Sequence, residues 1–573
     1  MRWVRAFVVI LLVALLLTAG AALVAWFVLH PAPPDLQVWR NGQVLTMDAD
    51  GSEATALAIE RDRIVAVGSD SDMAPFVERA AVVVDLDGAT VVPGFIEAHG
   101  HFPGAGLAAV AADLNSPPIA SVTSIEESIA ALQEVDRAQP GTDWLIGFGY
   151  DDTMLADKRH LSREDLDRVS TTRPVLAMHI SGHMVAVNSV ALERFEIDAD
   201  TPDPPGGEIR KGSDGEPTGL LLETASRDIL IEALKMPPMR QLALVRAAVQ
   251  DYASQGFTTV QNGLAPLDQI KGLSIASMIG LIPQRVVFWP KDELGVAAVR
   301  GDLDLTPYAG DRTLVGAVKF VGDGSIQGYT GYLTEPYYDP GAESDDYRGY
   351  PNVDSETLAK QVEEVHCAGS QVAVHGNGDA AIDQMLDAWE AALEACPADD
   401  PRPILVHAQM AREDQLTRMK RLGVVPTFFS AHVYYWGDRH RDIFLGPDRA
   451  ARISPAASAA ALDLAFTTHL DTPVVPVDAM LQLWAPVART TSSGQVLGVD
   501  QRISVVESLR GLTSAAAYQL KLEDDIGSIE PGKKADLVVL SDNPLTYDGD
   551  LRDIDVERTV ADGLVIYDAG APP

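Results

Sequence analysis

The pair His99 and His101 has the residue type and the spacing to bind a metal ion. The pair directly follows the apolar run 95–98 (FIEA), which is typical of a β-strand. Residues i and i+2 of a strand point to the same side, so both imidazoles could contact one ion. An HxH pair alone is weak evidence for a site, and its weight depends on what accompanies it.

Lys319 is the next residue whose surroundings demand an explanation. It lies within the apolar run 316–321 (GAVKFV), where a charge is costly unless it is paired or removed. Carbamylation by CO2 would remove the positive charge and create an anionic oxygen ligand for a metal. An ion pair with a nearby acid such as Asp323 is the alternative.

Three more polar residues end apolar runs. His375 follows 372–374 and His407 follows 404–406, positions at which a single histidine is more often a hydrogen-bonded core residue than a ligand. Asp471 comes directly after 464–470, and a buried carboxylate there needs a partner such as a metal ion or its bound water.

The order of apolar strands and helical patterns predicts how these residues meet. Strands and helices alternate through 95–515, which favours an α/β fold with a (β/α)8 TIM barrel and an insertion around 103–220. The carboxyl ends of barrel strands converge on one face. We therefore expect His99, His101, Lys319, His375, His407 and Asp471 to form one metal centre.

Both ends of the folded chain are rich in short strands and tight turns. Residues 35–94 contain the hairpin signal Asn41-Gly42, and 516–573 contain the turn signal Asp562-Gly563. We expect these two segments to form one small β-sandwich that is built from both chain ends.

Several motifs resemble signatures of the amidohydrolase superfamily. The run 92–101 (VPGFIEAHGH) looks like its first barrel strand, and 527–537 (GSIEPGKKADL) looks like its return to the sandwich. Further stretches resemble amidohydrolase family 3, the branch of YtcJ-like and N-substituted formamide deformylase-like metal-dependent hydrolases: 181–189, 256–260, 318–320 with 323–325, and 375–379. The resemblance covers about 35–570.

The resemblance implies a binuclear metal site, with zinc as the usual ion. His99, His101 and Asp471 would hold one ion, His375 and His407 the other. Carbamylated Lys319 would bridge the two ions, and a metal-activated hydroxide would attack the substrate, with Asp471 as general acid and base.

Other residues match or depart from the pattern of the family. His183 and His432 match the branch and are candidates for contacting the substrate, against a structural role for each. Glu97 stands where the family usually has Asp, and His469 adds an imidazole beside Asp471, where it would shape the leaving-group pocket or only pack. Five aromatic residues are candidates for a substrate wall: Tyr329, Tyr332, Tyr434, Tyr435 and Trp436.

The N-terminal 34 residues predict a membrane anchor or signal with its linker. Residues 6–29 are uncharged and apolar, about the length that a helix needs to cross a bilayer, and Arg2 and Arg5 precede them. We expect a single-pass transmembrane helix in the cytoplasmic membrane, with the catalytic domain on the extracytoplasmic side. If the small residues at 18–22 direct cleavage, the protein would be periplasmic or secreted.

Composition limits the classes of partner. The 573 residues carry a formal net charge of −38, which argues against nucleic acid. The two cysteines exclude a disulfide scaffold, and we expect no bridge between them. A homodimer is left open.

Together these features predict an enzyme that hydrolyses carbon–nitrogen bonds other than peptide bonds in a small-molecule substrate. An esterase or lactonase on the same centre is the alternative, and a non-catalytic interaction protein on the same fold is a third reading.

Overall fold

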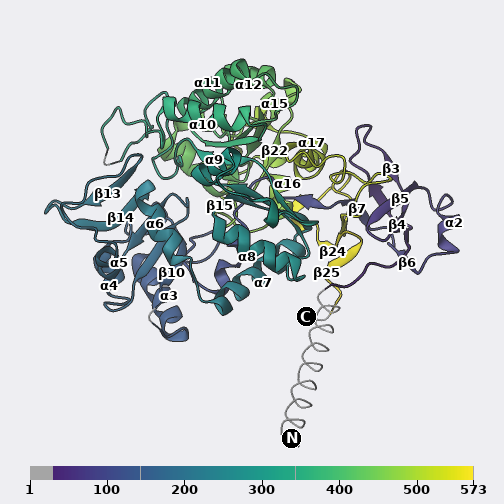
Figure 1. The fold of residues 1–573 in the computed structure, drawn as a ribbon, viewed down its shortest axis with the longest axis horizontal. Coiled ribbons are helices and arrows are strands. Elements are labelled where there is room, and N and C mark those ends of the chain that lie inside the picture. The colour runs from purple at the N-terminus through teal and green to yellow at the C-terminus, as the bar shows by residue number, and fades with distance from the viewer. Residues whose placement is uncertain (1–29, 142, 342, 572–573) are drawn as a thin grey trace, which may run out of the picture.

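Short parallel strands, most of them followed by a helix on the outer side, form the centre of the molecule (Figure 1). The computed structural model describes residues 30–141, 143–341 and 343–571. One sheet has the order β17-β16-β15-β8, and a second runs from β18 to β22. The strands are β8 (Phe95–Ile96), β15 (Phe257–Ala265), β16 (Arg285–Pro290), β17 (Thr313–Val315), β18 (Val318–Val321), β19 (Val372–Gly376), β20 (Ile404–His407), β21 (Val425–Phe428) and β22 (Thr467–Thr468).

Helices cover the outer side of these strands. Ser355–Cys367 shows why a helix forms locally: Asp354 caps its N-terminus by accepting a hydrogen bond from the Thr357 amide, and apolar residues recur on one face. The main outer helices are α7 (Pro238–Ser254), α8 (Leu267–Met278), α9 (Asp292–Arg300), α10 (Ser355–Cys367), α11 (Asp379–Ala395), α12 (Glu413–Leu422), α13 (His432–Arg439), α16 (Ala479–Ala488) and α17 (Val505–Leu512).

Backbone contacts join the two sheets into a closed ring. Lys291, directly after β16, forms a parallel bridge with Lys319 of β18. On the other side, the Asp471 amide donates to the His99 carbonyl at 3.2 Å, and the His101 amide donates to the Thr472 carbonyl at 2.8 Å. This closure brings the residue after the last strand beside the histidines after the first.

Successive side chains of β18 point to opposite sides of the strand, one side toward the outer helices and the other toward the interior of the ring. Val318 and Phe320 pack outward in the apolar cluster that includes residues of α10 and α11. Lys319 lies between them in sequence and therefore faces the interior of the ring, where it meets Trp289. A second apolar cluster fills the interior near Trp289: Val287, Ala317, Ala373, Ile404 and Val406.

An insertion between β8 and β15 carries its own sheet. Its order is β13-β14-β12-β11-β10-β9, and β10 and β11 run parallel with Tyr150 opposite His179. The strands are β9 (Ala112–Asp113), β10 (Leu145–Tyr150), β11 (Val175–His179), β12 (Met184–Val187), β13 (Gly207–Lys211) and β14 (Pro217–Glu223). Short helices flank the sheet: α3 (Ile125–Ala138), α4 (Arg163–Asp167), α5 (Ser189–Arg194) and α6 (Thr224–Ala233).

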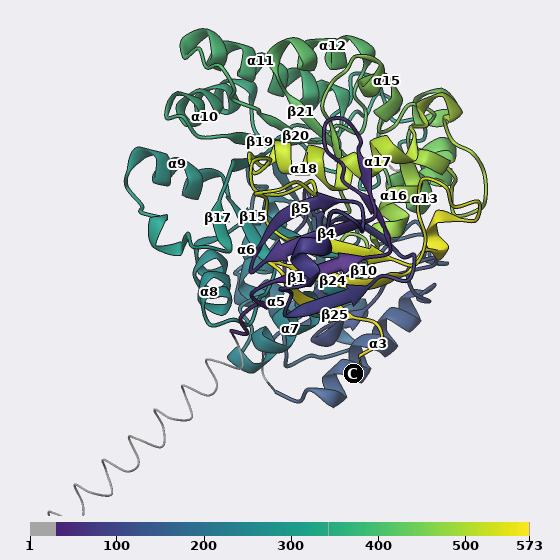
Figure 2. The ribbon, with the colours of Figure 1, turned by 90° about the vertical axis from the view of Figure 1, so that its right-hand side faces the viewer.

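Strands from both chain ends lie side by side in a third region, drawn in purple and yellow in Figure 2. β7 pairs antiparallel with β23, with Val92 opposite Val538. The two sheets have the orders β5-β4-β1-β6 and β25-β24-β23-β7-β2-β3. The strands are β1 (Gln37–Arg40), β2 (Gln43–Leu45), β3 (Glu53–Ala54), β4 (Ala56–Glu60), β5 (Arg63–Gly68), β6 (Val82–Asp85), β7 (Thr90–Pro93), β23 (Leu537–Leu540), β24 (Val556–Ala561) and β25 (Leu564–Asp568).

The transmembrane part of the predicted fold class and the predicted membrane localisation are corrected. Within 30–141, 143–341 and 343–571, no helix combines the length and the apolar character that crossing a bilayer requires. The segment predicted to cross, 6–29, lies outside the residues that the structure describes. The prediction of a transmembrane helix rested on hydropathy alone. The described residues form an α/β fold.

The prediction that the two cysteines stay unbridged is wrong. Cys367 ends α10 and Cys396 follows α11, and their sulfur atoms form a disulfide with Cα atoms 5.4 Å apart. The helices pack along each other, which brings two cysteines that are 29 residues apart in sequence to bonding distance.

A buried ion-pair network fastens the terminal strands to the barrel. Arg285 at the start of β16 contacts Asp536 at 2.9 Å and Asp562 at 3.3 Å, and all three side chains are nearly inaccessible to solvent.

We expect Arg285→Met to lower the free energy of unfolding by about 3–5 kcal/mol, because it leaves Asp536 as an unpaired buried carboxylate. Thermal and denaturant unfolding of the purified chain measure this.

The matched control is Arg61→Met. Arg61 pairs with Asp35 at 3.7 Å, but both side chains are mostly exposed, so its loss should cost less than about 1 kcal/mol. Equal destabilisation by the two substitutions would contradict the role of the network.

Candidate functional site

The candidate ligands lie at or near the carboxyl ends of the barrel strands, on one face of the ring. His99 and His101 follow β8, and Asp471 follows β22. The others are Lys319 within β18, His375 within β19 and His407 at the end of β20. The register places Val321 opposite His375 and Gly376 opposite His407, so neighbouring strands present their polar residues at nearly the same level.

Three of the histidines converge on the carboxylate of Asp471. Oδ1 lies 3.3 Å from Nε2 of His99 and 3.2 Å from Nε2 of His101, and Oδ2 lies 3.9 Å from Nε2 of His407. Oδ1 has no hydrogen-bond partner of proper geometry among the described residues. The ligand atoms of His99, His407 and Asp471 all lie within 4.8 Å of one another, and all three residues are buried.

Lys319 lies beside this cluster, and no carboxylate of the described residues forms an ion pair with it. Its Nζ is 3.5 Å from Nε2 of His99, and the side chain is 2% exposed. Asp323, the predicted alternative partner, instead accepts hydrogen bonds from His375 and from the amides of Asn377 and Gly378. Burial lowers the pKa of Lys319 to about 7, against the opposing charge of Asp471. A large share of this amine is therefore neutral near pH 7, which is the form that reacts with CO2.

His375 joins the cluster through His407. The two ring centroids are 4.4 Å apart, and the Nδ1 of His375 lies 3.2 Å from the Asp323 carboxylate. Burial is the main cause that lowers the pKa of His375, and it lowers those of His99 and His407 well below the ordinary value. These imidazoles are therefore neutral at pH 7, as metal binding requires.

Each of the buried histidines is oriented from behind by a contact at Nδ1. Nδ1 of His99 lies 2.9 Å from Oε1 of Gln261 in β15, and Nδ1 of His407 lies 3.2 Å from Nε2 of His469. In His99 and His407 the partner at Nδ1 leaves Nε2 directed toward the centre, an arrangement typical of metal-binding histidines. Nε2 of His375 also lies 3.3 Å from the side-chain nitrogen of Asn377.

The sequence alone did not predict that Gln261 and His469 would orient candidate ligands. Gln261 lies in the buried strand segment TTVQN, and a polar side chain in such a strand is the signal that could have identified it. His469 contacts His407 and packs against Phe429 with ring centroids 4.9 Å apart. The structure thus gives His469 a place behind a candidate ligand, whereas the sequence suggested a leaving-group pocket or simple packing.

The backbone is strained at the site. Asp471 and His407 have φ angles of 57° and 71°, and Glu223 at the end of β14 has 50°. Non-glycine residues rarely adopt the left-handed region, and such strain tends to cluster at functional sites.

His183 lies at the edge of the cluster. Its ring centroid is 4.9 Å from that of His375, its Nδ1 lies 2.9 Å from Oε2 of Glu223, and its side chain is partly exposed. Burial lowers the pKa of His183, but the charge and hydrogen bond of Glu223 outweigh this and raise the pKa overall.

His432 lies deeper and is held by other polar groups. Its Nδ1 is 3.1 Å from Nε2 of His440 and 3.2 Å from the amide of Gln409, and its ring packs on Phe429 at 4.3 Å. Of the predicted aromatic wall, Tyr435 and Trp436 line a small cavity, whereas Tyr434 packs on Trp484 and Tyr329 packs on Tyr337 and Phe444.

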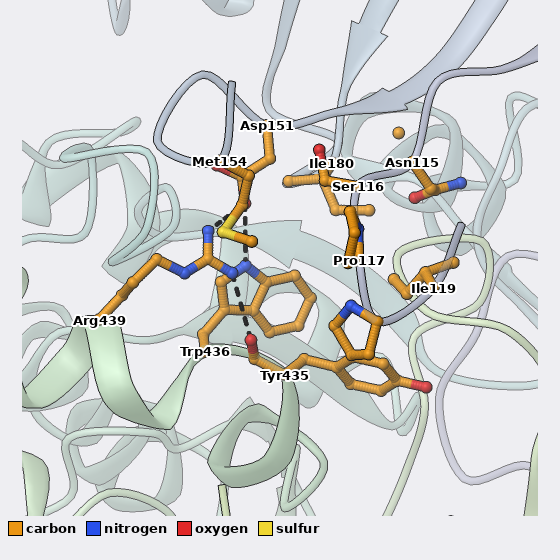
Figure 3. A pocket seen from close by; sticks show the side chains of 12 residues that line it. Asn115, Ser116, Pro117, Ile119, Asp151, Met154, Ile180, Tyr435, Trp436 and Arg439 are labelled. Carbon is orange, nitrogen blue, oxygen red and sulfur yellow. Dashed lines mark hydrogen bonds and ion pairs between the residues drawn. The ribbon is translucent and has the colours of Figure 1, made fainter. Parts of the chain in front are cut away.

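This cavity lies where the insertion meets α13 (Figure 3). Its volume is about 20 Å³, enough for about one water molecule. Arg439 points toward Asp151 of the insertion and forms an ion pair with it, and the indole nitrogen of Trp436 donates to the same carboxylate at 3.3 Å. These contacts hold the insertion against the barrel.

The donor set fits a metal centre. Imidazole nitrogen, carboxylate oxygen and a neutral lysine that can accept CO2 are ligands for zinc and similar divalent ions. The Asp471 oxygen without a hydrogen bond, surrounded by Nε2 atoms, is a position at which an ion would satisfy every group at once.

Comparison with known proteins shows the family of the chain. Residues 82–567 match the model of the amidohydrolase family. The chain is 30% identical to putative amidohydrolase YtcJ of Bacillus subtilis, covering 93% of this chain and 99% of YtcJ. It is 29% identical to N-substituted formamide deformylase of Arthrobacter pascens, covering 92% and 97% of the two chains.

A solved structure shares the fold. An uncharacterized metal-dependent hydrolase from Pyrococcus horikoshii superposes with a TM-score of 0.71 at 24% identity, covering 89% of this chain and 98% of that one.

The close approach of Gly263 to His99 gives a test of the site. A Cβ at position 263 would lie 2.3 Å from Cε1 and 2.5 Å from Nδ1 of His99, so Gly263→Ala must displace that ring. We expect the variant to fold but to bind zinc at least about tenfold more weakly, because the contact with Gln261 that orients His99 is lost. Equilibrium dialysis with elemental analysis measures this.

Gly272→Ala is the control, since no atom lies within 4 Å of the added Cβ. Unchanged zinc affinity in Gly263→Ala would show that His99 is not held in place as a ligand.

Proposed function

Because the chain belongs to the amidohydrolase family and is a hydrolase of carbon–nitrogen bonds, we propose that it cleaves a non-peptide amide or formamide-like bond of a small molecule, with Asp471 as general acid and base. The observation that carries the proposal is the carboxylate of Asp471, which Nε2 atoms of three histidines approach within 3.9 Å. The similarity to a protein named N-substituted formamide deformylase supports the choice of bond.

The donor groups are proposed to hold two divalent ions, with zinc as the first choice. When bound, the ions would make a hydroxide available near neutral pH and polarise the substrate carbonyl. The proposed ligands of the first ion are His99, His101 and Asp471, those of the second are His375 and His407, and the bridging ligand is carbamylated Lys319.

Asp471 is placed to move a proton. Its carboxylate is buried and surrounded by the candidate ligands. With Oδ1 directed to the ion, Oδ2 is the oxygen left for proton transfer, and it lies 3.9 Å from Nε2 of His407. It can accept the proton that the attacking oxygen loses and deliver it to the nitrogen that leaves. Amide hydrolysis needs this second step because an unprotonated amine anion is a poor leaving group.

His183 is proposed to contact the substrate. It lies beside His375, is partly exposed and is held by Glu223 through Nδ1, which directs Nε2 away from that contact. Since Glu223 favours the protonated imidazole, Nε2 can donate a hydrogen bond to a substrate oxygen.

For His432 we propose a positioning role instead, because its Nδ1 is engaged by Gln409 and His440.

Ester and lactone hydrolysis use the same attack on an acyl carbon, so these reactions remain the alternative. The presence of every candidate ligand in the sequence counts against a non-catalytic role, as does the spacing of His99, His407 and Asp471, whose ligand atoms lie within 4.8 Å of one another.

We expect Asp471→Asn to lower kcat by about 10²- to 10⁴-fold, because the amide cannot accept and return the proton. A hydrolysis screen of N-acyl amines, formamides, esters and lactones identifies the substrate class, and the variant is then assayed on the best substrate. Metal content is measured on the same samples, so that loss of an ion is separated from loss of proton transfer.

Asp463→Asn is the control, since Asp463 precedes the same strand but is fully exposed. Full activity of Asp471→Asn would refute the role of Asp471, and faster turnover of lactones than of any amide would favour the alternative reaction.

The carbamylation of Lys319 has its own test. Metal-free protein reloaded with zinc in CO2-free buffer should be less active than protein reloaded with bicarbonate. The difference should grow as pH rises toward and through 7, since the neutral amine becomes the major form above its pKa of about 7. A carbamate signal from ¹³C-labelled bicarbonate, present in the wild type and absent in Lys319→Met, reports the modification directly.

Equal reactivation with and without bicarbonate, together with no carbamate signal, would show that Lys319 acts as an unmodified amine.

A further inference from the structure

A second cluster of ligand-type side chains lies in the insertion. Asp152, His160 and His179 each offer one ligand atom, and these atoms lie within 4.8 Å of one another. The Asp152 carboxylate is 3.1 Å from Nε2 of His179 and 3.7 Å from Nε2 of His160. The shorter distance runs to Oδ1 and the longer one to Oδ2. Ligand atoms about 2.1 Å from a tetrahedral ion lie roughly 3.4 Å apart, so each imidazole lies near the separation expected from the carboxylate oxygen that it faces.

The topology of the insertion creates this cluster. β10 and β11 are parallel neighbours with Tyr150 opposite His179, so both strands end at the same edge. Asp152 comes just after β10, and His179 is the last residue of β11. His160 reaches the same point from the segment that leads to α4.

Both histidines are oriented by a hydroxyl at Nδ1. The Nδ1 of His179 lies 2.8 Å from Oγ of Ser181, and the Nδ1 of His160 lies 3.3 Å from the hydroxyl of Tyr150. The Ser181 amide also donates to Nδ1 of His179 at 3.2 Å, so without an ion Nε2 of His179 carries the proton and donates it to Asp152. Ion binding would displace this proton, and the Nε2 atoms of both histidines face the Asp152 carboxylate.

Access and charge also suit an ion. His179 is buried at the base, whereas the side chains of Asp152 and His160 are 19% and 31% exposed, so an ion could enter and keep a water ligand. The positive charge of Arg210 lies near His160 and would repel a metal ion. Arg210 forms ion pairs with Glu208 at 2.9 Å and Glu343 at 2.7 Å, which neutralise this charge.

Neighbouring residues connect the cluster to the contact between insertion and barrel. Asp151, next to Asp152, pairs with Arg439 of α13, and Ile180, next to His179, lines the same cavity (Figure 3). An ion at the cluster would fix the ends of β10 and β11 where they support this contact.

We propose that Asp152, His160 and His179 bind a divalent transition-metal ion, separately from the centre around Asp471. Two imidazoles and one carboxylate favour zinc, cobalt or nickel over magnesium or calcium, which prefer oxygen ligands. In the absence of an ion, a proton shared between His179 and Asp152 would hold the same side chains together, and the experiment must separate these two cases.

The experiment counts the ions per chain by difference. The full-length wild type and His160→Asn are stripped with a chelator, equilibrated with zinc alone and measured by elemental analysis. The variant should bind about one ion fewer per chain, because removing one of three protein ligands abolishes stable binding. Since both proteins share the centre around Asp471, incomplete loading there does not affect the difference.

His366→Asn is the matched control, because His366 lies at the end of α10, and its side chain contacts the carbonyl of Cys396 and the ring of Trp389, away from the cluster. Its zinc content should equal that of the wild type. If His160→Asn fails to fold, as judged by circular dichroism, Asp152→Asn replaces it.

Anomalous scattering at the zinc edge from crystals soaked in zinc gives the direct answer. A peak bounded by Asp152, His160 and His179 supports the proposal. Equal zinc content in variant and wild type, with no such peak, would overturn it and leave the three side chains as a hydrogen-bonded network.

Discussion

The site depends on the closure of the barrel between its first and last strands. The amide of Asp471 donates to the carbonyl of His99, and the amide of His101 donates to the carbonyl of Thr472. These two bonds hold a carboxylate and two imidazoles within about 3.3 Å, although the residues come from opposite ends of the barrel sequence. The strained backbone of Asp471 is tolerated because the surrounding bonds determine its conformation.

The terminal strands support this closure from outside. β7 leads directly into β8 and pairs with β23, so the entrance to the first barrel strand is held by the end of the chain. Arg285 extends the connection to β16 through Asp536 and Asp562. Strand pairing and buried ion pairs therefore join the terminal strands to the central ring, although these strands come from the two ends of the sequence.

Features that depend on short stretches of sequence could be predicted, among them the strand ends that carry candidate ligands. Apolar runs that end in a histidine or an aspartate mark the strand ends that carry His375, His407 and Asp471, and the structure brings these residues together. The family resemblance is confirmed by the match over 82–567.

Contacts between distant elements could not be predicted in this way. Gln261 lies behind His99, and His469 lies behind His407, only because separate strands are adjacent in the barrel. The disulfide likewise depends on the packing of α10 against α11, and its cysteines show no spacing signal. The cluster of Asp152, His160 and His179 is invisible in the sequence because a loop and two strand ends must meet to form it. Hydropathy at the N-terminus predicted a membrane-spanning element that the described helices do not contain.

The bridge between Cys367 and Cys396 has a consequence for the unfolded chain. The covalent loop that it closes contains β19, with His375, and all of α11. Closing a loop of 29 residues removes conformational entropy from the unfolded ensemble that is equivalent to about 3–4 kcal/mol at room temperature. The segment that presents His375 thus starts folding from a restricted set of conformations, so the disulfide raises the free energy of unfolding of the chain that carries this candidate ligand.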